Sequence, residues 1–134
     1  MAYSIDLPAA ARRHLQAAEV LCHDKARPDV AGYLFGIAAE CAIKVMMRDA
    51  GLRPLRADQR RDDPYYAHFP ELRTMLRDSA TGRGAKPLGD FIASDSFMNN
   101  WSTQMRYAPA SDIESHWIKA WAADAKRAVD AMGT

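Results

Sequence analysis

The longest stretch of apolar positions in the chain lies between residues 28 and 50. Its few remaining positions fall on one line with helical i, i+4 spacing: Gly32, Gly36, Glu40, Lys44 and Arg48. A helix that is apolar nearly all round has to be buried against several neighbours. The pattern therefore predicts a central helix, with Pro28 in its first turn and Gly51 as its C-terminal stop.

Two amphipathic patterns flank this helix. The first follows Asp6 and Pro8, which are suited to an N-cap and a first helical turn. Its apolar stripe consists of Leu7, Ala11, Leu15, Ala18 and Leu21/Cys22. The second begins at Ser111 or Asp112 and ends at Gly133, and its expected inward positions are Ile113, Trp117, Trp121, Ala125, Ala128 and Met132. Both stripes predict long helices packed on the central one.

The middle of the chain carries shorter and weaker signals. Residues 53–67 are polar and interrupted by proline, which predicts a loop, and residues 81–84 predict a second one. The expected helices here are one over 69–78, a short one over 87–92, and one that Ser94 or Asp95 caps and that runs towards Met105. Tyr107-Ala108-Pro109 ends this last segment, because the residue before proline avoids the helical region.

These elements together predict an all-α protein. No stretch alternates in the manner of a strand, so we expect an up-and-down bundle of four main helices plus one or two short helices. A length of 134 residues fits a single domain over 1–134.

Composition narrows the function only a little. The formal net charge is +1, from 18 basic and 17 acidic residues, so only a local patch could attract nucleic acid or a membrane. Cys22 and Cys41 are expected to be buried free thiols, with a bridge or a reactive cysteine as the alternatives, and no metal or cofactor pattern is present. The N-terminus lacks a signal-peptide pattern and no uninterrupted apolar run is long enough to span a membrane, so we expect a cytoplasmic protein.

Glu40 and Lys44 are the first candidate functional residues. Glu four residues before Lys is the favourable orientation for a helix ion pair. The pair either belongs to a solvated stripe on an otherwise buried helix or lines a cleft or subunit interface. Gly32 and Gly36 on the same line would let a backbone or a ligand approach closely.

Arg106, Tyr107 and His116 are the second group of candidates. Arg106 lies at a predicted helix end beside Tyr107 and Pro109, and a guanidinium fixed in this way suits phosphate or carboxylate. The alternative is a structural Arg that bonds helix carbonyls, with Tyr107 in the core. His116, in the first turn of the last helix, is either an acid–base group or an exposed helix histidine.

Two further features are expected to be structural. Trp117 and Trp121 are four apart on an amphipathic helix, which favours core packing over an RNA-stacking platform. The arginines of the 53–67 segment alternate with aspartates, which predicts a solvated loop.

Three strings, in order, resemble the HEPN domain family. They are Ala38-Ala39-Glu40-Cys41-Ala42-Ile43-Lys44, similar to the family's A-x-E-x-x-(I/L)-K helix; His68-Phe69-Pro70-Glu71-Leu72, similar to its third helix; and Arg106-Tyr107-Ala108-Pro109, similar to its RYP turn. The resemblance spans about residues 8–130. It implies a bundle of four to five helices that is commonly a homodimer.

The resemblance also implies a set of functions. The first function that the resemblance implies is that of a HEPN-like module in a toxin–antitoxin or defence system. Such a module would dimerise and bind a nucleotide or RNA through Glu40, Lys44, Arg106 and Tyr107. One alternative is a metal-independent endoribonuclease in which Arg106 stabilises phosphorane charge and His116 exchanges protons. Nine residues separate Arg106 from His116, whereas the family's ribonucleases carry an R-x(4–6)-H pattern. The other alternative is a non-catalytic partner of a nucleotidyltransferase or an antitoxin.

Overall fold

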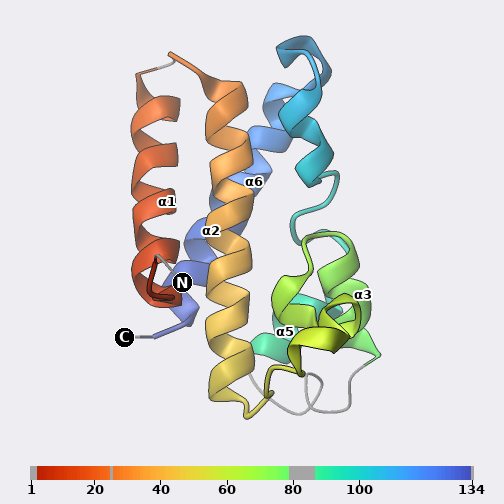
Figure 1. The fold of residues 1–134 in the computed structure, drawn as a ribbon. Coiled ribbons are helices and arrows are strands. Elements are labelled where there is room, and N and C mark those ends of the chain that lie inside the picture. Colours follow the sequence, from red (N-terminus) through yellow and green to blue (C-terminus); the bar gives the residue numbers. More distant parts are fainter. Residues whose placement is uncertain (1–2, 25, 79–86, 134) are drawn as a thin grey trace.

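A computed structural model of the chain describes residues 3–24, 26–78 and 87–133. Regular structure in these ranges is helical, without a strand. Three long helices form the frame: α1 (Leu7–His23), α2 (Pro28–Asp49) and α6 (Ser115–Ala131). Helix α2 packs against both of the others (Figure 1). The predicted all-α bundle and its central helix are confirmed.

Local sequence signals set the ends of α1 and α2. The Asp6 side chain accepts a hydrogen bond from the Ala9 amide at 3.1 Å and so caps α1. Gly51 follows α2 with φ +91, the left-handed conformation that favours glycine at a helix stop. Along α1, the predicted stripe faces the bundle and buries Ala11, Leu15 and Ala18.

The shorter elements lie at the level of the C-terminal half of α2. They are η1 (Ala57–Asp62), η2 (Pro64–Tyr66), α3 (Glu71–Arg77) and α5 (Leu88–Ala93) (Figure 1). Helix α3 packs on η2 and α5, and α5 contacts α2. The predicted helices over 69–78 and 87–92 correspond to α3 and α5. The predicted loop over 53–67 instead contains two short 3-10 helices, and the expected loop over 81–84 lies outside the described residues.

One aspartate of this segment explains why it is more ordered than a solvated loop. Asp63 is 1% exposed, and its carboxylate accepts the amides of Leu55 at 2.9 Å and Tyr65 at 3.0 Å. The acidic residues of 53–67 were expected to be solvated, and for Asp63 this expectation is wrong. A buried carboxylate with two amide donors holds the segment together.

The expected helix from Ser94 or Asp95 towards Met105 is also wrong. Residues 95–100 form turns, in which Met98 and Asn100 have φ of 53 and 72. Asp124 of α6 accepts the Met98 amide at 2.8 Å and stabilises this path. Only the 3-10 helix η3 (Thr103–Tyr107) follows, ending before Pro109 as predicted.

The last helix begins later than predicted. It starts at Ser115, because Ala110–Asp112 forms the separate 3-10 helix η4 and Ile113 is extended. Its inward positions Trp121, Ala125, Ala128 and Met132 are buried as expected, while Trp117 and Ile113 are half-buried.

Two tryptophans cover Gly32 and Gly36, which form the N-terminal half of the line that runs from Gly32 to Arg48 on α2. The Trp101 indole donates to the Gly32 carbonyl at 3.1 Å, and a Cβ placed on Gly36 would lie 1.8 Å from the same indole. The ring of Trp121 comes within 3.0 Å of the Cβ position of Gly32. The close approach that the two glycines allow is therefore made by the protein's own side chains.

Helix α2 is long and apolar enough to cross a membrane by length and composition alone. However, 67% of the window that meets this test is buried inside the bundle, and core helices of soluble proteins pass the same test. The helix is accounted for by its packing against α1 and α6.

Candidate functional site

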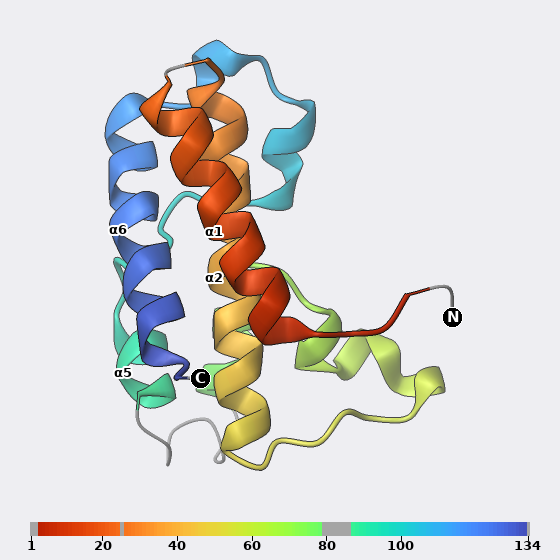
Figure 2. The same ribbon diagram turned by 90° about the vertical axis from the view of Figure 1, so that its left-hand side faces the viewer.

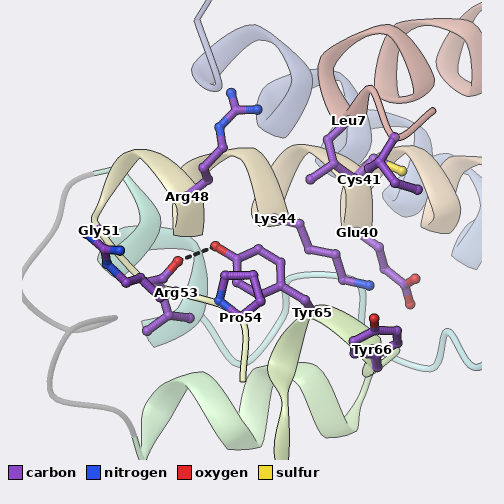
Figure 3. A pocket seen from close by; sticks show the side chains of 12 residues that line it. Leu7, Glu40, Cys41, Lys44, Arg48, Gly51, Arg53, Pro54, Tyr65 and Tyr66 are labelled. Carbon is purple, nitrogen blue, oxygen red and sulfur yellow. Dashed lines mark hydrogen bonds between the residues drawn. The ribbon is translucent and has the colours of Figure 1, made fainter. Parts of the chain in front are cut away.

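A cleft of about 820 Å³ lies along the C-terminal half of α2. One wall is α2 itself; the others are the N-terminal segment before α1 and the segment that follows Gly51, which approach each other in Figure 2. The lining residues are Ile5, Leu7, Glu40, Cys41, Lys44, Arg48, Gly51, Leu52, Arg53, Pro54, Tyr65 and Tyr66 (Figure 3). Its volume falls in the range of small-molecule sites.

Glu40 forms the inner end of this cleft and is fixed by the chain that enters α3. Its side chain is 4% exposed; one oxygen lies 2.8 Å from His68 Nδ1, and the other accepts the Phe69 amide at 2.9 Å. Burial raises the pKa of Glu40, and the contacts with His68 and Phe69 oppose this effect. The carboxyl group is therefore held in a fixed position, and the effect of burial on its pKa is the larger one.

Lys44, one turn further along α2, is 9% exposed. It makes no ion pair or hydrogen bond with the residues that the structure describes. Burial lowers the pKa of Lys44, and the negative charges of Glu40 and Asp63 partly restore it. The amine extends along the cleft towards the Glu40 carboxyl group (Figure 3). A lysine with so little exposure and no ion pair is costly, which is why such residues usually have a partner.

The rim of the cleft carries arginines and tyrosines. Arg48 and Arg53 are exposed, and the Arg48 guanidinium is turned away from the Lys44 amine (Figure 3). The Tyr65 hydroxyl donates to the Leu52 carbonyl at 2.6 Å, which fixes its ring in the wall. Tyr66 is 54% exposed, and the Arg60 guanidinium lies 4.9 Å from its ring centroid. These groups offer cations and aromatic faces to a ligand.

Arg106, Tyr107 and His116 do not line this cleft. Arg106 is exposed and donates to the Thr103 carbonyl at 3.0 Å, as the structural alternative expected. Tyr107 is 83% exposed, with the Arg106 guanidinium 5.3 Å from its ring centroid, so the part of that alternative that places Tyr107 in the core is wrong. His116 is exposed and lies 3.5 Å from a Glu114 oxygen. η3 and the start of α6 lie at the other end of the bundle from Gly51 (Figure 1).

The structure thus divides the predicted ligand-binding residues into two groups. Glu40 and Lys44 share the cleft, whereas Arg106 and Tyr107 lie on the surface elsewhere. The interpretation of Glu40 and Lys44 as part of a solvated stripe is wrong, because both are buried.

Sequence reasoning missed the walls of the cleft. Tyr65, Tyr66 and Arg53 belong to a segment expected to be a plain loop, and His68 was named only in the string that resembles the family's third helix. The one available signal was the Pro64-Tyr65-Tyr66 string, in which two aromatic residues stand in an otherwise charged stretch.

No group of three His, Cys, Asp or Glu side chains that could hold a metal ion occurs among the described residues. Cys22 and Cys41 are free and half-buried, and burial raises the pKa of the Cys41 thiol. The polar groups that line the cleft are an amine, a carboxyl group, guanidinium groups, tyrosine hydroxyls and the Cys41 thiol.

A scan against protein-family models and searches of curated proteins and solved structures found no match to this chain. Fold and site by themselves define an all-α bundle with an apolar-walled, cation-bearing cleft beside its central helix.

Proposed function

We propose that this chain is a HEPN-like helical module that binds a nucleotide in the cleft beside α2. The observation that carries the proposal is Lys44, an amine that is 9% exposed, faces a cleft of about 820 Å³ and has no ion pair within the described part of the chain. The similarity of residues 38–44 to the A-x-E-x-x-(I/L)-K string supports the same assignment.

A phosphate group would supply the missing counter-charge. Transferring an ammonium group out of water is compensated when an anion accompanies it, and phosphate oxygens accept hydrogen bonds from lysine well. Arg48, which pairs with Asp49 at 3.5 Å, and Arg53 are exposed at the rim, where they could turn towards further phosphates. Glu40 adds a negative charge, but its oxygens are already bonded to His68 and the Phe69 amide.

The remaining walls suit a nucleoside. Leu7, Leu52 and Pro54 provide apolar surface, and the rings of Tyr65 and Tyr66 offer faces on which a base can stack. Most small-molecule sites combine such apolar walls with a few polar groups. The cleft has this composition, with its cations on α2 and its rim.

Titration with ATP, GTP and a short single-stranded RNA by calorimetry tests the proposal. We expect saturable binding of at least one nucleotide, weakened about tenfold or more in Lys44→Met, which keeps the length of the side chain. Lys126→Met is the matched control, because Lys126 is an exposed lysine paired with Asp130 on α6. Equal binding by wild type and Lys44→Met would reject the cleft as the site.

We propose that Arg106 and Tyr107 contact only ligands longer than a mononucleotide, such as RNA. A mononucleotide held by Lys44 should bind equally to wild type and Arg106→Ala. Loss of RNA binding in Arg106→Ala, with ATP binding retained, would indicate a second contact on η3. A homodimer and a nucleotidyltransferase or antitoxin partner remain part of the HEPN-like proposal, and light scattering and co-purification with the product of a neighbouring gene test them.

A further inference from the structure

An amine and a carboxyl group are placed together on one wall of the cleft, one helical turn apart. Lys44 is more than nine-tenths buried, and its amine has no hydrogen-bonded partner among the described residues. The Nζ atom itself is not fully enclosed, so the small exposed part of Lys44 includes this atom. The amine runs towards Glu40 (Figure 3), whose carboxyl group contacts the half-exposed His68 ring behind it.

We propose that the cleft is also a carbonyl-binding site, in which Lys44 forms an imine with an aldehyde or ketone, Glu40 transfers the protons and His68 connects Glu40 to solvent. This inference concerns a different activity of the same cleft from nucleotide binding. It rests on the placement of these three side chains, and each of them has a definite part in the reaction.

The reaction balances without any oxidant or reductant. The Lys44 nitrogen uses its lone pair to form a bond to the carbonyl carbon, and the carbonyl oxygen takes a proton from Glu40. The resulting carbinolamine loses its hydroxyl group as water when a second proton reaches it. The two hydrogens that the amine gives up replace those delivered to the oxygen, so the net products are one imine and one water.

The protonation of the two groups suits this role. Imine formation needs a neutral amine, and burial lowers the pKa of Lys44. Proton delivery needs a protonated acid, and burial raises the pKa of Glu40 against the opposing effect of its hydrogen bonds with His68 and the Phe69 amide. The His68 ring, at 2.8 Å from Glu40 and 50% exposed, is placed to return protons from solvent. Lys126, by contrast, is an exposed lysine paired with Asp130 on the surface of α6.

The apolar walls favour the product over the reactants. An imine in water is hydrolysed, so a site that stabilises one has to exclude water. Leu7, Leu52 and Pro54 contribute apolar surface to the lining of the cleft. The ligand expected from this lining is a small aldehyde or ketone with an apolar or aromatic body.

Trapping with a reducing agent tests the inference on the intact chain. The protein is incubated at neutral pH with benzaldehyde, which carries no charge, or with pyridoxal 5′-phosphate, which adds a phosphate, and borohydride then converts any imine to a stable secondary amine. Peptide mapping by mass spectrometry identifies the labelled lysine. We expect Lys44 to be labelled faster than Lys119 or Lys126, because burial lowers the pKa of Lys44 and so increases the share of neutral amine.

Three variants separate the roles. Lys44→Met should abolish the fast adduct, Lys126→Met should leave it unchanged, and Glu40→Gln should slow it and flatten its dependence on pH. Labelling of Lys44 no faster than of Lys126 with both aldehydes would overturn the inference. Fast labelling that Glu40→Gln leaves unaltered would overturn the part assigned to Glu40.

The same experiment distinguishes this inference from the proposed function. If ATP binds through Lys44, an excess of ATP should protect the amine from both aldehydes. Fast labelling without any nucleotide binding would reject the nucleotide proposal alone, and nucleotide binding without fast labelling would reject the carbonyl site alone.

Discussion

The line of residues from Gly32 to Arg48 on α2 has two halves with different surroundings, although helical spacing places all of them on one face. Around Gly32 and Gly36, the indoles of Trp121 and Trp101 fill the space that the missing side chains leave. Around Glu40 and Lys44, no side chain of similar size fills the space, and a cleft of about 820 Å³ remains. Small residues on this buried helix therefore allow close packing, whereas a cleft lies beside the long polar side chains of the same line.

The largest effect on stability is expected at Gly36, where one added methyl group disrupts the packing of Trp101 against α2. In Gly36→Ala the new Cβ would meet the Trp101 ring at 1.8 Å, so the indole has to move and loses its hydrogen bond to the Gly32 carbonyl. Urea denaturation should show a loss of about 3 kcal/mol of unfolding free energy, as overpacked cores do.

Gly32→Ala is the matched comparison. Its Cβ would lie 3.0 Å from Trp121, a contact that a small shift relieves, and alanine is the better helix former. A change within about 1 kcal/mol is expected. Equal losses in the two variants would show that the two glycines are not packed differently.

Glu40 connects the C-terminal half of α2 to the chain that enters α3. Glu40→Ala leaves the buried Phe69 amide without its acceptor and should cost about 2 kcal/mol, measured by urea denaturation at neutral pH. Glu19→Ala on the exposed face of α1 should change stability by no more than about 0.5 kcal/mol. A loss as small as in this control would contradict an anchoring role.

Glu40 also predicts a dependence on pH. Its folded pKa is raised above the ordinary value of 4.5, so just above that pH the folded chain keeps a proton that the unfolded chain releases. The contribution of Glu40 to stability is therefore complete below pH 4.5 and declines as pH rises through the folded pKa. Glu40→Gln should lack this decline, and parallel curves for both proteins would contradict the raised pKa.

Lys44 is expected to lower the stability of the fold, and its pH dependence should have the opposite sign to that of Glu40. Lys44→Met removes a buried charge and keeps its volume, and it should stabilise the protein by about 1 kcal/mol at neutral pH. The lowered pKa means that the unfolded chain binds more protons up to the ordinary value of 10.5, so wild-type stability rises with pH and the advantage of Lys44→Met disappears there. A destabilised variant would show that the amine has a partner in the fold.

The smallest structural effects are expected at the far end of the bundle. Arg106→Ala and His116→Ala alter exposed side chains and should each change the unfolding free energy by no more than about 0.5 kcal/mol. Incubation of the wild type with a mixed RNA pool in EDTA tests the ribonuclease alternative. Cleavage that both variants abolish would establish that alternative, although neither residue lies in the cleft.

The sequence by itself determined the frame of this protein. Helical periodicity, the Asp6 cap and the Gly51 stop located α1 and α2, because these signals act within one turn of the chain. The amphipathic stripe of α6 was equally readable. The path through residues 94–102 was not, because it depends on Asp124, distant in sequence, which accepts the Met98 amide.

Tertiary structure alone decided which part of the α2 line became a site. The sequence showed that Gly32, Gly36, Glu40 and Lys44 share a face, since helical spacing fixes this. It did not show what covers that face, because Trp101, Trp121 and the 53–67 segment reach α2 through long-range packing. Burial of Lys44 and its altered pKa follow from those distant contacts, so the chemistry of the cleft appears only when the chain is folded.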